Sequence, residues 1–176
     1  MAIRIIGIDP GLRSTGWGIV ESAGTETAYI ASGRIRPDDK KGTAGRLKEI
    51  HEGLEAVIKT YAPSEAAVEE TFVNRDPQSA LKLGEARAVA LVVPALFGLT
   101  VAEYAANLIK KTLTGTGHAD KSQIAAMVGI LLPGSGLGSG DAADALAVAI
   151  THARFRSTAS LRIRKRTYEA AKKRLC

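Results

Sequence analysis

The sequence predicts an α/β domain in which a mixed five-stranded sheet is flanked by α-helices. Three observations lead to this fold class. Residues 3–9 form a nearly continuous apolar run, as in strands that are buried on both faces. Apolar residues recur at helical spacing between residues 43 and 61. Beyond residue 61, strand-like and helix-like segments alternate, an order that produces parallel strands joined by helices.

The first three predicted strands follow one another closely. Pro10-Gly11 ends the strand at 3–9, and residues 15–21 and 27–36 form two further strand-like segments. Ala23-Gly24 supplies the turn between them. Strands joined by such short turns pair antiparallel, so we expect the chain to open with an antiparallel meander.

The next segments are a helix and a short strand. The helix is expected over residues 43–61, with Thr43 as its N-cap and Ala62-Pro63 at its end. Residues 66–70 then form a short strand that carries Glu69. A strand that follows a helix in this way commonly joins the same sheet.

A second long helix is expected over residues 77–97. Asp76 is a suitable N-cap, and Pro77 occupies the first helical position. Its small and aliphatic residues cover more of the circumference than a surface helix needs. We therefore expect it to be buried from two sides, either by another layer of the same chain or by a second subunit.

Two further elements complete the predicted fold. Residues 99–104 form the last strand, which reaches the sheet by a crossover and therefore lies parallel to its neighbour. The segment from Asp120 to Gln123 matches a capping box and opens a helix that extends to Leu132.

Composition favours a single cytoplasmic domain. The chain has 176 residues and is 45% hydrophobic, which suffices for one core. Its single cysteine, Cys176, is the last residue, so no intrachain disulfide can form. The start of the chain lacks the pattern of a signal peptide. The apolar stretch 88–99 is too short and too interrupted to span a membrane, so no membrane association is expected.

The net charge of +6 is concentrated at the C-terminal end. Residues 154–176 contain nine Lys or Arg against one acidic residue, so the rest of the chain is slightly acidic. We expect a nuclease domain over residues 1–156 and a basic tail over residues 157–176. Such a tail beside an acidic pocket suits a protein that holds a polyanion. The alternative is that these charges merely solubilise a terminal helix.

Four carboxylates stand at the ends of apolar segments and are the candidate catalytic residues. Asp9 ends the first strand, Glu69 lies in the short strand, and Asp141 and Asp144 share one face of the last helix. If the two strands are neighbours, Asp9 and Glu69 face each other, and the strand alternation turns Glu70 away. Clustered carboxylates suit Mg²⁺ or Mn²⁺, and two such ions can support hydrolysis of a phosphodiester.

Six motifs, in order, resemble those of the RuvC family, the bacterial Holliday-junction resolvases of the RNase H-like and retroviral-integrase superfamily. The resemblance extends from residue 5 to about residue 153, and three of the six motifs hold the acids. The motifs are GIDPGLRSTGWGIV from Gly7, EETF from Glu69, SALKLGEARAVA from Ser79, EYAA from Glu103, ADKSQ from Ala119 and DAADALAVAITHA from Asp141.

The resemblance implies an RNase H-like fold and a metal-dependent endonuclease that acts on four-way DNA junctions as a homodimer. It would use Mg²⁺, with Mn²⁺ as a substitute and two ions in each active site, and leave symmetric nicks with 5′-phosphate ends. The helix from Pro77 to Phe97 would form the dimer interface, and RuvA and RuvB would be its partners in branch migration. The resemblance gives the catalytic and metal-binding roles to Asp9, Glu69, Asp141 and Asp144.

Four other residues are candidates for DNA contact. Lys110 and Lys121 occupy positions where the family has lysines near the DNA, and a cation there could hold the scissile phosphate. Phe72 follows Glu69 closely and could wedge against an unstacked base at the junction. Arg75 lies in the loop after it.

Two other functions are compatible with parts of the sequence. The chain could be a noncatalytic module that binds junctions, although such a module has no need of four intact acids. The segment from Asp9 to Gly16 also resembles the first phosphate loop of actin-like ATPases and sugar kinases. That fold needs two such domains, and the sequence offers no second loop of this kind.

Overall fold

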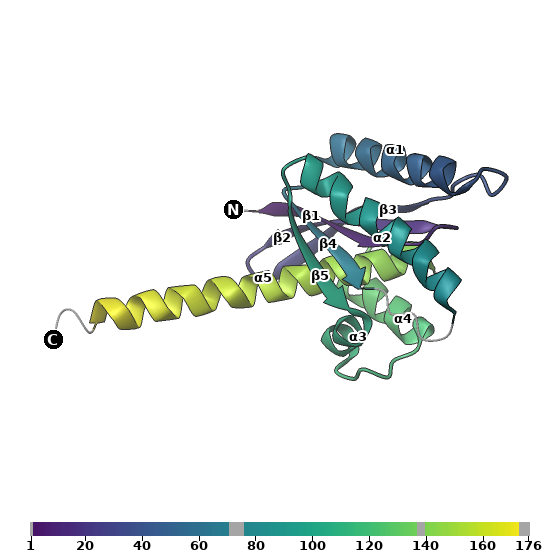
Figure 1. Cartoon of the computed structure of the whole chain (residues 1–176). Coiled ribbons are helices and arrows are strands. Elements are labelled where there is room, and N and C mark those ends of the chain that lie inside the picture. The colour runs from purple at the N-terminus through teal and green to yellow at the C-terminus, as the bar shows by residue number, and fades with distance from the viewer. Residues whose placement is uncertain (1, 71–75, 137–139, 173–176) are drawn as a thin grey trace.

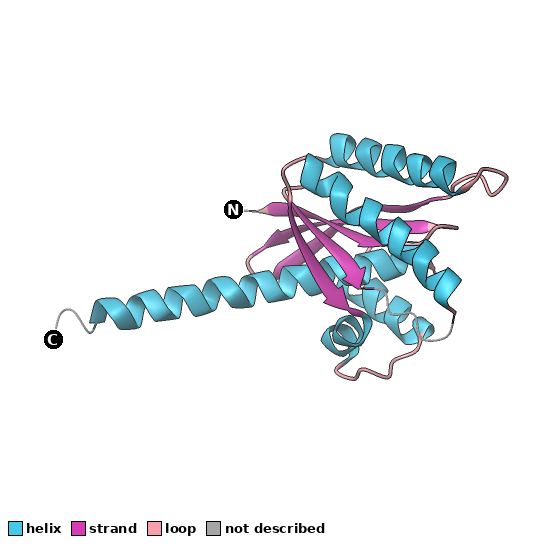
Figure 2. Ribbon diagram, viewed as in Figure 1, coloured by secondary structure: helices cyan, strands magenta, loops and turns pink. Residues whose placement is uncertain are grey.

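A five-stranded sheet forms the centre of the molecule, with helices on both of its faces (Figures 1 and 2). The computed structural model describes residues 2–70, 76–136 and 140–172, with side chains described as far as residue 156. In chain order the elements are β1 (Ile3–Asp9), β2 (Thr15–Ala23), β3 (Glu26–Ile35), α1 (Thr43–Tyr61), β4 (Glu65–Glu70), α2 (Pro77–Leu96), β5 (Thr100–Ala105), α3 (Ala106–Thr114), α4 (Lys121–Leu131) and α5 (Asp141–Lys172).

The strand order is β3-β2-β1-β4-β5, and the sheet is mixed. The first three strands pair antiparallel, whereas β4 pairs parallel with both β1 and β5. This arrangement confirms the predicted antiparallel meander and the predicted crossover to the last strand. The chain thus has the expected α/β fold class.

Alternation along the strands divides the core into two layers. Ile5, Val20 and Ala67 point to the face covered by α3, α4 and α5. Their neighbours Ile6 and Ile19 point to the opposite face, which α1 and α2 cover. Because both faces of β1 are buried, its apolar sequence is continuous rather than alternating.

Helix α5 lies directly on the backbone of β1 and β2, where the strands have glycine. A Cβ atom at Gly7 would lie 2.1 Å from the carbonyl oxygen of Ala145 in α5. At Gly16 it would lie 2.0 Å from the carbonyl oxygen of Asp141, and at Gly18 it would collide with the side chain of Leu146. The absence of side chains at these three strand positions therefore allows the close approach of α5.

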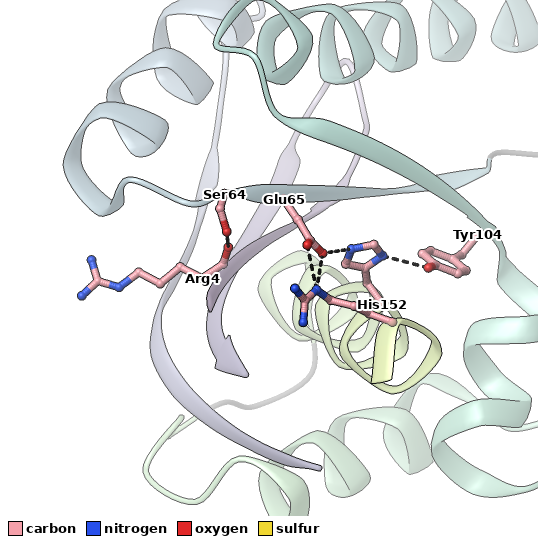
Figure 3. A network of polar contacts seen from close by, with 6 residues as sticks. Arg4, Ser64, Glu65, Tyr104 and His152 are labelled. Carbon is pink, nitrogen blue, oxygen red and sulfur yellow. Dashed lines mark hydrogen bonds and ion pairs between the residues drawn. The ribbon is translucent and has the colours of Figure 1, made fainter. Parts of the chain in front are cut away.

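A polar network fixes α5 against β4 and β5 about two turns beyond Asp144. Figure 3 shows the carboxylate of Glu65 directed at His152, with Tyr104 on the other side of the imidazole ring. The Glu65 Oε2 atom lies 2.9 Å from His152 Nε2, and His152 Nδ1 lies 2.8 Å from the Tyr104 hydroxyl. Arg156 Nε donates to both oxygens of Glu65, at 2.7 and 2.8 Å.

The start of β4 is also tied to β1. Ser64 donates from its backbone N–H to the carbonyl oxygen of Arg4 at 2.9 Å, and its hydroxyl reaches the same oxygen at 3.3 Å (Figure 3). Arg4 Nη1 donates to the carbonyl oxygen of Tyr61 at the end of α1. These contacts fix the lateral position of β4, and thereby the position of Glu69 at its far end.

The structure corrects two details of the predicted elements. The N-cap of α1 is Gly42 rather than Thr43, and it makes no side-chain capping bond. Helix α3 was not expected, because β5 passes into it at Ala105 without a breaker and only Ile109 and Leu113 mark its buried side. The capping box that opens α4 at Asp120 is present as predicted.

Within the described chain, α2 is buried from one side only, so burial from two sides by the same chain is wrong. Its inner face consists of Ala86, Ala90, Val93 and Pro94, and α1 packs closely on it. Leu81, Val92 and Leu96 are instead 69%, 52% and 70% exposed. The small inner residues serve a close helix contact, and the outward aliphatic residues remain uncovered.

Helix α5 continues without a break through the predicted domain boundary at residues 156 and 157. Its C-terminal part extends past the edge of the sheet (Figure 1). No helix in the described residues is both long and apolar enough to cross a membrane.

Replacing Gly7 with alanine should destabilise the fold, because the new methyl group would push α5 away from β1. Backbone collisions of this kind cost at least about 1–3 kcal/mol of unfolding free energy. Thermal unfolding would show a loss of about 2–4 °C for each kcal/mol in a domain of this size.

Gly129→Ala is the matched control for this substitution. Gly129 lies in α4, and a Cβ atom added there would have no other atom within 4 Å, so alanine should stabilise the helix by about 0.5–1 kcal/mol. A Gly7→Ala protein as stable as the wild type would contradict the close contact between α5 and β1.

Candidate active site

Asp9 and Glu69 lie at the adjacent C-terminal ends of two parallel strands. The register between β1 and β4 pairs Ile8 with Val68, so the next residues along are Asp9 and Glu69. Both side chains project from the face that α5 covers, because they are two residues beyond Gly7 and Ala67. Glu70 alternates to the other face, as the sequence predicted.

Helix α5 and two lysines complete a cavity of about 250 Å³ around these acids. Asp144 enters from the first turn of α5, Lys110 from α3 and Lys121 from the first residue of α4. Three of the four predicted catalytic acids and both predicted DNA-contact lysines therefore line one cavity.

Asp141, the fourth acid, lines a neighbouring cleft. It accepts a hydrogen bond of 2.6 Å on its Oδ2 atom from the Ser14 hydroxyl. The charge of Asp141 still contributes to the raised pKa of Asp9, so the two carboxylates are close enough to repel each other. The pair at 141 and 144 thus begins α5 as expected, but the two side chains lie in different clefts.

The protein raises the pKa of two of these acids strongly. Burial, followed by repulsion from Glu69, Asp144 and Asp141, raises the pKa of Asp9 from 3.8 to about 8. Burial and the charge of Asp144 raise the pKa of Glu69 from 4.5 to about 7. A site that opposes the negative charge of its own carboxylates is one that favours a bound cation.

Lys121 supplies one such positive charge. Its Nζ atom lies 3.3 Å from Asp144 Oδ2, and the attraction of Asp144 raises the pKa of the lysine. Its side chain is 79% exposed, so the ammonium group can also reach a substrate. Lys110 lines the same cavity, and its charge offsets part of the rise in the pKa of Glu69.

The donor set suits a hard divalent ion, because carboxylate oxygens from three elements face one cavity. Among the residues that the structure describes, however, no three Asp, Glu, His or Cys side chains stand close enough to form a finished metal site. Asp144 instead faces the Lys121 ammonium, and Asp141 accepts a hydrogen bond from the Ser14 hydroxyl.

The sequence also predicted two DNA-contact residues beyond the lysines, and it did not point to two residues that lie near the acids in the structure. Phe72 and Arg75 lie outside the described residues, so their contact with DNA stays a prediction. Ser14 and Arg46 were overlooked. Arg46 Nη2 donates to the carbonyl oxygen of Leu12 at 2.7 Å and so holds the loop between β1 and β2. The only sequence signal for Ser14 is its place in the motif that begins at Gly7. The sequence of α1 contains no pattern that predicts a role for Arg46.

The family of the chain follows from comparisons with known proteins. The family model described as crossover junction endodeoxyribonuclease RuvC matches residues 5–152 of the chain. The chain belongs to the RuvC family. The family is one of metal-dependent nucleases.

Individual RuvC proteins are similar over most of their length. The crossover junction endodeoxyribonuclease RuvC of Beijerinckia indica is 67% identical, over 88% of this chain and 88% of its own length. That of Methylocella silvestris is 64% identical, over 91% of this chain and 91% of its own length. Among solved structures, Thermus thermophilus RuvC in complex with a Holliday junction substrate aligns with a TM-score of 0.81 at 30% identity. That alignment covers 89% of this chain and 96% of the T. thermophilus chain. The RNase H-like resolvase fold is thus confirmed.

The raised pKa of Asp9 predicts a stability that falls with rising pH in the absence of divalent ions. The folded state holds the Asp9 proton up to about pH 8, whereas the unfolded chain releases it near pH 4. Stability should therefore decline across this interval and be lowest above pH 8. Asp9→Asn should flatten the decline, measured as the unfolding temperature between pH 5 and pH 9 in EDTA.

Asp39→Asn, a change at an exposed loop residue, is the control. It should decline with pH as the wild type does. Added Mg²⁺ should raise the unfolding temperature of the wild type at pH 8 more than that of Asp9→Asn. Equal pH profiles for the wild type and Asp9→Asn would contradict the burial of an opposed charge at Asp9.

Proposed function

We propose that this chain resolves four-way DNA junctions by paired, symmetric nicks, and that Asp9, Glu69, Asp141 and Asp144 are its catalytic residues. Family membership and the similarity to junction-bound T. thermophilus RuvC support the reaction. One structural observation carries the assignment of the residues. Three of these acids, from β1, β4 and α5, share one cavity with two lysines, and Asp141 lines the neighbouring cleft.

The cofactor in this proposal is Mg²⁺ or Mn²⁺, with two ions in each site held by the four acids. Bound divalent ions would activate water and offset charge on the leaving oxygen of an in-line displacement. The acids supply ligands from three rigid elements, an arrangement that limits how far each oxygen can move. Asp144, together with Asp141, which accepts a hydrogen bond from the Ser14 hydroxyl, would help to hold the divalent ions.

The lysines act on the substrate. Lys121 is placed to exchange its contact with Asp144 for an oxygen of the scissile phosphate. Such an exchange follows naturally if ions take over the neutralisation of Asp144. Lys110, which lines the cavity from α3, would hold the same strand by its charge.

The structure gives less support to the two alternatives. A module that only binds junctions would not need buried carboxylates whose charges are unfavourable in the folded state. The actin-like interpretation requires a second phosphate loop, and the sequence supplies none. We therefore retain catalysis as the proposed function.

We propose that the protein is a homodimer joined through α2. Leu81, Val92 and Leu96 form an exposed aliphatic surface on this helix, here called the α2 surface. A two-fold dimer would present two equivalent active sites to a junction whose strands are related by the same symmetry. Paired nicks follow directly from that arrangement.

Three further features belong to the proposal. The basic C-terminal part of α5 contacts DNA without sequence preference, as its charge suggests. RuvA and RuvB are the partners in branch migration. Because the proposed substrate is chromosomal DNA, the protein works in the cytoplasm of a bacterial cell.

Glu69→Gln should reduce cleavage of a synthetic immobile junction by about a hundredfold or more, the size of effect expected when one electrostatic contributor to a transition state is lost. Junction affinity should stay near that of the wild type, because the acid repels DNA rather than binding it. Cleavage with Mg²⁺ and gel-shift binding without it measure the two quantities separately.

Glu70→Gln is the control, since it changes the neighbouring carboxylate on the opposite side of the strand. It should cleave as the wild type does. Full activity in Glu69→Gln, or equal losses in both variants, would remove Glu69 from the catalytic set.

Leu96→Glu should convert the dimer into a monomer, because it places a charge in the apolar α2 surface. Sedimentation of the wild type should give about twice the chain mass of 18.5 kDa, and the variant should give the single value. The monomer should also lose coordinated nicking of two strands.

Ile130→Glu is the matched change on α4, where the isoleucine is 68% exposed against 70% for Leu96. It should remain a dimer. A dimeric Leu96→Glu protein would place the interface elsewhere.

A further inference from the structure

A second cleft, with three cationic side chains in its lining, opens beside the candidate active site. It has a volume of about 590 Å³, and its walls come from the β1–β2 loop, α1, α2 and the first residue of α5. The starts of these three helices lie at the same end of the sheet, where β1 and β4 end (Figure 1). We call it the basic cleft and define it by Arg13, Ser14, Arg46, Ser79, Lys82 and Asp141.

The charge of the basic cleft is strongly positive. Arg13, Arg46 and Lys82 line it, against the single carboxylate of Asp141. Arg13 and Lys82 are exposed, whereas Arg46 is held in place by its bond to the Leu12 carbonyl. None of the ion pairs in the described part of the chain involves these three cations.

The basic cleft also has a defined outer end. A further hollow continues from Arg13 and Arg46 toward Arg36, but there Asp38 and Asp39 join the lining. Two carboxylates at that point offset two of the three arginines there and so weaken the attraction for a polyanion. The attraction is therefore stronger in the segment that adjoins Asp141, where three cations face one carboxylate.

Asp141 stands at the border between the basic cleft and the cavity of the other three acids. Lys110 and Lys121 lie on the cavity side, and Arg13 and Lys82 lie on the cleft side. The acids are thus flanked by cations in both directions. A single anion would need only one of these groups, whereas a chain of phosphates that crosses the acids would use both.

We propose that the basic cleft binds the phosphodiester backbone of the cleaved strand on one side of the scissile phosphate, while Lys110 and Lys121 bind it on the other. Arg13 and Lys82 contact the phosphates, and Arg46 fixes the loop that presents Arg13. This proposal rests on the proposed junction cleavage, because it assigns a path to the same substrate. It adds a contact surface that lies outside the four acids and the two lysines.

The test compares two double variants that remove the same charge. Arg13→Gln with Lys82→Gln alters the basic cleft, and Lys48→Gln with Lys59→Gln alters exposed cations along α1. Junction binding is measured without divalent ions, so that no strand is cut, over roughly 50 to 200 mM salt. Each lost phosphate contact should reduce the slope of log affinity against log salt by about 0.9.

Both proteins should bind more weakly as salt rises fourfold. The fold loss of affinity should be about twelve times smaller for the cleft variant than for the wild type. The α1 variant should keep the wild-type slope. Arg13→Lys with Lys82→Arg should also keep it, because the charges remain, and this outcome excludes a folding defect as the cause. Equal slopes for the wild type and the cleft variant would overturn the proposal.

A second measurement locates the contact on the DNA. Neutral methylphosphonate linkages are placed one at a time on either side of the cleavage position. On one side, a linkage should weaken binding by the wild type but leave the affinity of the cleft variant unchanged. If no linkage shows this coupling, the strand does not follow the basic cleft.

These results are separable from the fate of the proposed function. A wild-type protein that neither binds nor cuts the junction would end both proposals. The wild type could bind and cut the junction while the cleft variant keeps both the wild-type salt slope and the wild-type response to methylphosphonate linkages. That result would overturn only the path through the basic cleft.

Discussion

Helix α5 lies against the bare backbone of β1 and β2, and the geometry of the candidate active site depends on this contact. Gly7 and Gly18 admit the helix along its length, and Gly16 admits its first turn, where Asp141 and Asp144 begin. The Glu65 network holds the helix about two turns further on. With both points fixed, the helix can neither slide nor rotate, and Asp144 remains beside Asp9 and Glu69.

The same packing creates an electrostatic cost. Acids at the end of a strand would be well solvated in an open loop, but here α3, α4 and α5 enclose them, and burial is the largest cause of both raised pKa values. The Lys121 ammonium offsets part of the repulsion through Asp144. A fold that tolerates such a cluster has a site whose stability and cation affinity are coupled.

Much of this arrangement could be predicted from the sequence, because the strands of the sheet carry strong local signals. The run Ile3–Asp9 is apolar on both faces, and Asp76-Pro77 and the Asp120 capping box mark helix starts through their own backbone bonds. Helix α3 gave no such signal. The Glu65, Tyr104 and His152 network and the Ser14 contact to Asp141 join residues 48 to 127 positions apart, so no local pattern could reveal them. The composition of α2 left two explanations open, because it cannot distinguish burial by the same chain from burial by a second subunit.

One parallel pairing explains why the acids and the cations meet. Although β1 pairs antiparallel with β2, β4 runs in the same direction as β1, so β1 and β4 deliver their last residues to one edge. An antiparallel β4 would carry Glu69 to the opposite edge, near Arg4 and Glu21. The starts of α1 and α2 lie at the same edge, because each helix follows a strand that ends there and must turn back across the sheet. The first residues of α4 and α5 supply Lys121 and Asp141, and early turns of α1 and α2 supply Arg46 and Lys82. Direction of pairing thus places the carboxylates side by side and surrounds them with positive charge.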